Sequence, residues 1–238
     1  PEAGITRDAV TVDYHDRNGA WALTDTAGMR RKANVSEKVE KLAVGDALNA
    51  IRYAEVVVVV LDAEQPLEKQ DNMIAALAEQ EGRALVLAIN KWDTVEDEKA
   101  FMKAFRQRLD YVLPQISGAA VVQVSAEKKK NIGKLLKACQ QAHEVWNRKI
   151  STGELNRWLE KALAKHTPPL VDGRRLKIRY MTQKSVRPPS FILFANLSEI
   201  PESYSRYLVN SMREWFDLPG TPIRIKVRKG DNPYAKKK

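Results

Sequence analysis

Two nearly unbroken apolar runs in the first half of the chain restrict its fold more than any other feature. They are VVVVVL at residues 56–61 and ALVLAI at residues 84–89, and each is about as long as one β-strand. A strand that is apolar at every position is covered on both faces, which is typical of a parallel sheet. Neither run approaches the roughly 20 residues of a membrane-spanning helix, so we expect no membrane segment, and we expect no signal peptide either.

The same pattern extends over the first 150 residues. Apolar residues at helical spacing separate the last four of five predicted strands, which are residues 8–14, 20–25, 54–63, 84–90 and 119–125. Asn18-Gly19 is a good hairpin turn, so the first two strands are predicted to form an antiparallel pair at one edge of the sheet. The alternation predicts the α/β class with a doubly wound, mostly parallel sheet.

The pattern changes near residue 151, where a small α+β domain is predicted. Its elements are a helix at 153–166, a strand at 174–181, a Pro-rich separator at 182–189, a strand at 190–197, a helix from Pro201 with Trp215 in its apolar stripe, and a strand at 223–228. We therefore divide the chain into residues 1–150, residues 151–230 and a basic tail at 231–238.

Charge is distributed unevenly between these parts. Residues 1–150 hold 22 Lys and Arg and 22 Asp and Glu, whereas residues 151–238 hold 18 and 8. A basic excess in one small domain favours a polyanionic partner such as nucleic acid, although an inert basic surface stays open as the alternative. The single cysteine, Cys139, is predicted to be a buried helix residue, and the lack of any internal disulfide fits a reducing, cytoplasmic location.

The tetrapeptide NKWD at residues 90–93 follows a predicted strand and points to guanine. A carboxylate at Asp93 can accept two hydrogen bonds from the ring N–H and the exocyclic amino group of guanine, and adenine offers no such pair. Asn90 would contact N7 of the base and brace neighbouring loops, and the Lys91 stem would lie along the ring. In SAEKKKN, Ser125 and Ala126 end another strand, and the Ala126 N–H could bind guanine O6, while the three lysines are expected to be a solvated loop.

Two further segments suit phosphate and Mg²⁺. Asp25 in DTAGM would hold Mg²⁺ through water, and the Gly28 N–H would meet the γ-phosphate. Thr6 in GITRD could ligate the same ion, although an N-cap or loop role for this threonine is the alternative. The 238 residues contain no G-x-x-x-x-G-K-[ST] loop, which is the usual phosphate cradle.

Together these motifs resemble the translational GTPase superfamily, and GITRD, DTAGMRRK and NKWD are similar to the second GTPase domain of the bacterial ribosome-assembly GTPase family EngA/Der. The later segments PPLVDGRRLKIRY, PESYSRYLVNSMRE and GTPIRIKVRKGDNPYAKK resemble the KH-like domain of that family. The resemblance implies GTP and GDP, Mg²⁺ and a K⁺ ion as ligands. It also implies a P-loop and a first GTPase domain upstream in the same polypeptide, so we expect this chain alone to bind GTP feebly.

Two departures refine the expected activity. Met29 stands where Ras-like enzymes carry a water-orienting Gln, so slow hydrolysis is expected, with movement of about residues 29–44 when the γ-phosphate leaves. The glycines of the KH-like segment include no G-x-x-G pair, which such domains use to grip RNA. Basic side chains could still contact rRNA phosphates, namely Arg174, Arg175, Lys177, Arg179, Lys184 and Arg187.

The sequence therefore predicts a GTP-hydrolysing switch in the biogenesis of the large ribosomal subunit, with rRNA as a partner, no membrane contact and a monomeric state. The alternative is that the chain as it stands is a non-catalytic rRNA- or ribosome-binding module.

Overall fold

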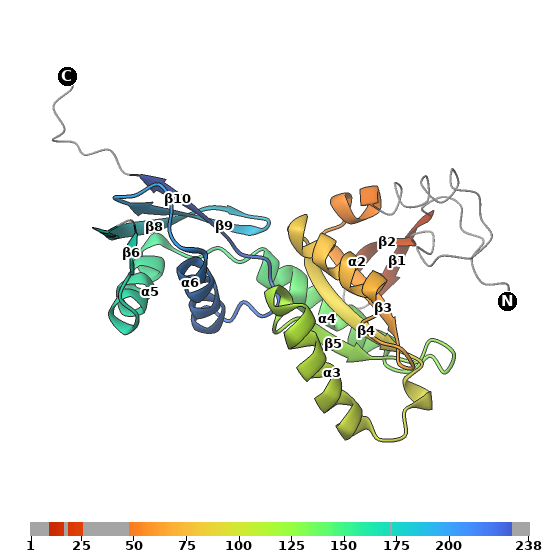
Figure 1. The fold of residues 1–238 in the computed structure, drawn as a ribbon. Coiled ribbons are helices and arrows are strands. Elements are labelled where there is room, and N and C mark those ends of the chain that lie inside the picture. Colours follow the sequence, from red (N-terminus) through yellow and green to blue (C-terminus); the bar gives the residue numbers. More distant parts are fainter. Residues whose placement is uncertain (1–9, 17–18, 26–47, 172, 230–238) are drawn as a thin grey trace, which may run out of the picture. The chain divides into compact units, whose positions relative to one another are not determined.

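The computed structural model describes residues 10–16, 19–25, 48–171 and 173–229 of the 238-residue chain (Figure 1). The chain divides into two compact units, Pro1–His143 and Glu144–Lys238. In the described ranges no helix has the length and apolar character needed to cross a bilayer. Each unit has its own hydrophobic core, and each is described by itself.

The first unit is organised around three parallel strands, which confirms the predicted α/β class. They are β3 (Val56–Asp62), β4 (Ala84–Asn90) and β5 (Ala120–Gln123), hydrogen-bonded in that order. β3 and β4 pair in register from Val56 with Ala84 to Asp62 with Asn90. Because the strands are parallel, their carboxyl ends lie at the same rim of the sheet.

Helices cover both faces of this sheet, as a doubly wound arrangement requires. On one face α2 (Lys69–Gln80) and α3 (Glu98–Val112) bury their apolar sides against alternate residues of β3 and β4. On the other face α4 (Ile132–Trp146) packs Ala138 and Cys139 against Val86 of β4. β4 thus shows one side-chain set to each helix layer, which explains why its run is apolar throughout, whereas Val58 and Val60 on the second face of β3 are 36% and 59% exposed. Cys139 is buried in a helix, as predicted.

The predicted hairpin is present as β1 (Val10–Asp16) and β2 (Gly19–Asp25), which pair antiparallel over their whole length. Its placement at an edge of the parallel sheet was wrong, because the two strands form a separate two-stranded sheet. No strand of the described residues lies between β2 and β3 to join the two sheets. The hairpin instead contributes Trp21 to the cluster around Val86.

The second unit is a three-stranded sheet with two helices. α5 (Thr152–Lys165) and α6 (Glu202–Trp215) lie on the same side of the sheet formed by β8 (Ile178–Val186), β9 (Pro189–Ala195) and β10 (Arg224–Lys229) (Figure 1). The strand order is β10-β9-β8, with β9 antiparallel to β8 and parallel to β10. The predicted order of helix, strand, strand, helix and strand is confirmed.

Three details of the second unit differ from the sequence prediction. The expected separator at 182–189 is mostly strand, because β8 continues to Val186 and the chain turns at Arg187 and Pro188. β9 then begins at Pro189, and a first strand position tolerates a residue without an N–H. The predicted strand at 174–181 is divided, since β7 (Arg174–Arg175) pairs with β6 (Leu170–Val171) instead. Trp215 is 52% exposed rather than part of the apolar stripe.

Candidate functional site

Asn90 and the loop after β5 are joined at the carboxyl rim of the parallel sheet. Asn90 is the last residue of β4, and its Oδ1 accepts a hydrogen bond of 3.0 Å from the Ala126 backbone N–H. The backbone continues this link, because the Trp92 N–H donates to the Val124 carbonyl at 3.0 Å. The segment NKWD and the segment beginning at Ser125, which are far apart in the sequence, are therefore adjacent in the fold.

Asp93 lies in the short 3₁₀ helix Trp92–Thr94, and its carboxylate is exposed. The hydroxyl of the buried Ser125 donates a hydrogen bond to it, which is the main reason why the pKa of Asp93 is lowered from its ordinary value. The backbone N–H of Asp93 lowers the pKa as well, desolvation opposes the shift, and the charges of Lys128 and Lys130 add a smaller lowering. The side chain is thus held as a carboxylate that can accept hydrogen bonds.

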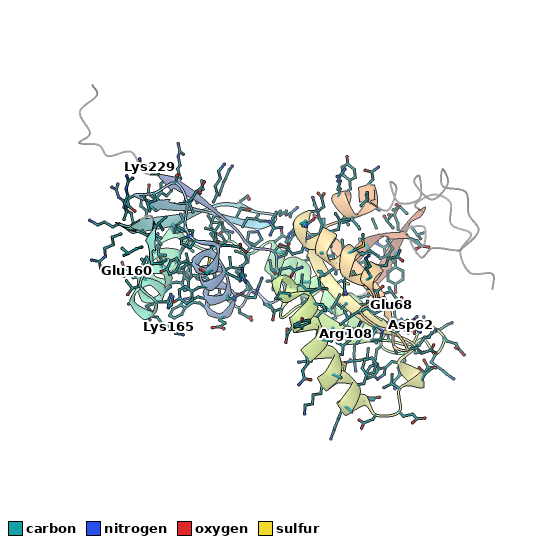
Figure 2. The ribbon with its side chains drawn as sticks, in the orientation of Figure 1. Asp62, Glu68, Arg108, Glu160, Lys165 and Lys229 are labelled. Carbon is teal, nitrogen blue, oxygen red and sulfur yellow. The ribbon has the colours of Figure 1, made fainter. Side chains whose placement is uncertain are left out.

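The Lys91 side chain is held by a residue that the sequence interpretation missed. The Lys91 backbone is left-handed, with φ of 60°. Its ammonium group lies 2.7 Å from Oδ2 of Asp62, whose side chain is only 16% exposed. Asp62 is the last residue of β3 and is labelled in Figure 2. Asp62 Oδ1 also accepts a hydrogen bond of 3.0 Å from the Glu64 N–H. Asp62 therefore fixes the direction of the lysine stem across the rim.

The three lysines after Ala126 lie in a short, exposed loop, as the sequence suggested. The loop is closed by backbone hydrogen bonds between Ser125 and Lys130, and Ser125 Oγ accepts a bond of 3.1 Å from the Lys128 N–H. Asn131 ends it by donating from Nδ2 to the Gln123 carbonyl at 2.9 Å. These bonds set the position of Ser125, and through it that of Asp93.

The phosphate side of the predicted site falls mostly outside the described residues. Thr6, Gly28, Met29 and the segment 29–44 all lie there, so their roles stay predictions. Asp25 is the exposed last residue of β2, in the separate hairpin. Among the residues that the structure describes, no three or more His, Cys, Asp and Glu side chains form a cluster suited to a metal ion. A Mg²⁺ site here would need oxygen atoms from nucleotide and water as well.

The basic side chains predicted to contact RNA lie in and around β7 and β8 of the second unit. All six are exposed: Arg174, Arg175, Lys177, Arg179, Lys184 and Arg187. Arg187 is partly engaged within the unit, because its Nε donates to Asn147 Oδ1 and its guanidinium lies 5.7 Å from the centre of the Trp146 ring.

Family models match both parts of the chain. Residues 1–91 match a model described as a 50S ribosome-binding GTPase. Residues 149–228 match one described as the C-terminal KH-domain-like domain of EngA bacterial GTPase enzymes.

Curated relatives match the chain from end to end. GTPase Der of Bradyrhizobium sp. (strain ORS 278) is 52% identical over 239 residues, which cover 100% of this chain and 52% of the relative. GTPase Der of Brucella melitensis biotype 2 is 52% identical over 236 residues, which cover 99% of this chain and 49% of the relative. The chain thus spans about half the length of the curated relatives it matches.

Solved structures share the fold. Era in complex with MgGDPNP and nucleotides 1506–1542 of 16S ribosomal RNA matches with a TM-score of 0.52 and 16% identity, over 95% of this chain and 82% of that chain. Era from Aquifex aeolicus bound to GDP and AlF4⁻ also gives a TM-score of 0.52 at 16% identity, over 98% and 84%. At this identity the likeness concerns the fold alone.

Proposed function

Because the chain belongs to the family of the bacterial GTPase Der, also called EngA, we propose that it is part of a GTP-binding and GTP-hydrolysing switch that acts in assembly of the large ribosomal subunit. The observation that carries the proposal is the linked rim of Asn90, Asp93, Ser125 and Ala126. Two hydrogen bonds tie the ends of β4 and β5 together there and leave an ionised carboxylate exposed.

In this proposal the rim reads the base. Asp93 accepts hydrogen bonds from the guanine ring N–H and amino group, and a site built for such a pair can reject an analogue that lacks it by as much as about 10⁴-fold. Lys91, held by Asp62, lies along the ring. The Ala126 N–H is bonded to Asn90 in the present structure, so contact with guanine O6 would require sharing of that donor.

We assign the phosphate side to Thr6, Asp25 and Gly28. Asp25 supplies an exposed carboxylate, which fits one outer ligand of Mg²⁺, and the nucleotide would supply most of the remaining oxygen atoms. Mg²⁺ would neutralise charge on the phosphates. A K⁺ ion near them is part of the proposal on the family resemblance alone. Met29 cannot orient water, so hydrolysis should be slow, and loss of the γ-phosphate would release the segment 29–44.

We also propose that the 238 residues alone bind nucleotide weakly, because they contain no G-x-x-x-x-G-K-[ST] loop. A chimaera avoids the lack of this loop and so tests the proposal. In it, the residues that precede the matched region in the Bradyrhizobium relative are joined to the start of this chain. The chimaera should bind mant-GDP with Mg²⁺ and discriminate against mant-ADP. Asp93→Asn should shift its preference towards xanthosine nucleotides, because an amide can donate where a carboxylate only accepts. Unchanged guanine selectivity in Asp93→Asn would remove Asp93 from this role.

A second candidate function is an rRNA- or ribosome-binding module without catalysis. It is favoured by the basic excess after residue 150 and by the exposure of the six predicted phosphate contacts. The double variant Arg179→Gln with Lys184→Gln should weaken binding to large-subunit rRNA and reduce its salt dependence. Unchanged binding in this variant would exclude these two residues of β8 as rRNA contacts. If the chimaera binds rRNA but shows no guanine-nucleotide binding, this module is the better account. In either case we propose a cytoplasmic, monomeric protein whose first GTPase domain lies elsewhere in the same polypeptide.

A further inference from the structure

The three strands of the second unit present one face to the helices and one face away from them. Met181, Phe191, Leu193 and Ala195 are buried in the core with α5 and α6. Side chains alternate along a strand, so the residues between them point to the opposite side. We call this side the outer face, and it consists of Tyr180, Thr182 and Ser185 on β8, Ser190, Ile192 and Phe194 on β9, and Arg224, Lys226 and Arg228 on β10.

The strand register orders these nine side chains into three rows. Tyr180 pairs with Phe194, which pairs with Arg228. The next row joins Thr182, Ile192 and Lys226, and the last joins Ser185, Ser190 and Arg224. β-Bulges between Ile178 and Tyr180 and between Gln183 and Ser185 keep β8 in step with β9. Each row thus runs from a neutral side chain on β8 to a cation on β10.

One corner of the outer face is aromatic. The Tyr180 and Phe194 rings are stacked, with centroids 4.3 Å apart and planes inclined by 14°. Tyr180 is 44% exposed, Phe194 is half-buried, and neither ring belongs to the core beneath. A flat π-system that stacks on this pair would extend it and bury the exposed ring face.

The opposite edge of the outer face is cationic. Arg224, Lys226 and Arg228 repeat at every second residue of β10, which places them about 6.6 Å apart along the strand. Lys226 and Arg228 are exposed, and Arg224 is half-buried. β8, β9 and β10 contain no acidic residue. A row of positive charge on a sheet whose strands carry no acidic residue is complementary to a chain of phosphates.

We propose that the outer face binds single-stranded RNA, with bases stacked on Tyr180 and Phe194 and the phosphate backbone along Arg224, Lys226 and Arg228. A stacking platform beside a cationic row is the combination by which single strands are held without a G-x-x-G grip. A duplex keeps its base faces stacked inside the helix and can use only the cations. An acidic peptide offers phosphate-like charge but nothing that needs the flat aromatic pair.

The outer face includes none of the six basic residues chosen from the sequence, which lie on β7, on β8 and in the short segments that follow these two strands. The outer face shares no residue with the linked rim of Asn90, Asp93, Ser125 and Ala126, and RNA binding there needs no guanine nucleotide. Its test is therefore independent of the GTPase proposal. If RNA binding is found without GTP binding, only the GTPase proposal fails, and if GTP binding is found without RNA binding, only the outer-face proposal fails.

The test measures fluorescence anisotropy of the 238-residue chain with a fluorescein-labelled single-stranded RNA of about ten nucleotides, without nucleotide or Mg²⁺. The unlabelled competitors are the same strand and its blunt duplex. Loss of one stacked base should weaken binding by about 5- to 150-fold in Tyr180→Ala. Tyr180→Phe keeps the ring and should bind within about twofold of the parent chain. The single strand should compete better than the duplex.

The charged row has its own matched control. The double variant Lys226→Gln with Arg228→Gln should reduce the slope of log K against log salt by about 1.4, or about 0.7 for each phosphate contact. The control is Arg157→Gln with Lys165→Gln, which removes the same charge from exposed positions on α5; Figure 2 shows Lys165 on the helix side of the unit and Lys229 of β10 on the sheet side. The control should leave the slope unchanged.

Three results would overturn the proposal. They are an equal loss in the control and the β10 variant, unchanged binding in Tyr180→Ala, and equal competition by the duplex. Failure of the chain to bind RNA at low salt would also end it and leave an acidic protein as the partner to seek. Photo-crosslinking of the parent chain with a 4-thiouridine strand needs no variant. It should mark peptides of β8 and β9, and crosslinks confined to other peptides would contradict the assignment.

Discussion

The structure predicts that replacing one amide by a carboxylate will loosen the second unit. Asn156 on α5 is joined to β8 by two hydrogen bonds: its Nδ2 donates to the Met181 carbonyl at 3.0 Å, and its Oδ1 accepts from the Met181 N–H at 2.9 Å. Nδ2 also donates to the Thr152 carbonyl at 2.7 Å. Met181 follows Tyr180, so this amide holds the strand that carries the aromatic corner of the outer face.

Asn156→Asp keeps the shape of the side chain and removes both donated bonds. Each lost bond is worth about 0.5–1.5 kcal/mol, so the unit should lose about 1–3 kcal/mol of stability. The introduced carboxylate would face two carbonyl oxygens, which raises its pKa in the folded state above the unfolded value. Its protonated form regains a donor, so the stability deficit should be smaller near pH 4 than at pH 7.

The assay must report on one unit at a time, because a chain with two cores need not unfold in a single step. Hydrogen exchange read by mass spectrometry does this. Peptides from β8 and β9 should exchange about 5- to 150-fold faster in Asn156→Asp than in the parent chain at pH 7. Peptides from β4 in the first unit should not change.

The matched control makes the same substitution at Asn147, where the hydrogen bond described above is one that the amide oxygen accepts. Asn147 Oδ1 accepts from Arg187 Nε, so Asn147→Asp keeps that bond and adds an opposite charge beside the guanidinium. It should leave exchange unchanged or slow it. If Asn147→Asp and Asn156→Asp accelerate exchange equally, added negative charge and not the lost donor is the cause, and the reasoning fails.

Three further outcomes are expected. Ser125→Ala removes the hydroxyl that contributes most to the lowered pKa of Asp93, so the Asp93 carboxyl should titrate at higher pH in a ¹³C NMR titration. Guanine binding should then be lost at a higher pH as the solution is acidified. An unchanged titration of Asp93 would show that the hydroxyl is not the cause of the lowered pKa. Burial raises the pKa of Cys139 to about 11, so the folded chain should react with a thiol reagent at pH 8 far more slowly than the unfolded chain, and rapid reaction of the folded chain would contradict its burial. Leu193→Ala empties a fully buried position and should cost about 2–5 kcal/mol, seen as faster exchange in the second unit only.

The parallel sheet could be predicted from the sequence because a single physical requirement governs it. A strand covered on both faces must be apolar at every position, and β4, which is buried from Ala84 to Ile89, is apolar over that whole span. β3 carries the same kind of run, although its Val58 and Val60 are exposed. The β8–β9 hairpin was harder to predict from the sequence. Its strands pass through polar residues and prolines, and only pairing with β9 makes residues 182–186 extended. Local preference at such a segment is overridden by the tertiary contacts.

The linked rim of Asn90, Asp93, Ser125 and Ala126 was predictable in part for a similar reason. NKWD and Ser125 each follow an apolar strand, and parallel strands bring such ends together. Asp62 was missed although it also ends an apolar run, because its role depends on the register that sets it opposite Asn90. Asn90 was expected to brace neighbouring loops, and its Oδ1 does accept from the Ala126 N–H; which loop atom it would meet depends on where two loops come together and could not be predicted.

The structure also bears on whether the basic excess after residue 150 is an inert surface. An inert surface intersperses charges of both signs. α5 and α6 do so, with five basic and four acidic residues between them. β8, β9 and β10 hold six basic residues and no acidic one, and the alternation along β10 turns the partly buried Ile225 and Val227 towards the core and Arg224, Lys226 and Arg228 to the outer face. The charge is therefore segregated onto the sheet side beside the stacked pair of the exposed Tyr180 and the half-buried Phe194, which favours a binding surface over an inert one.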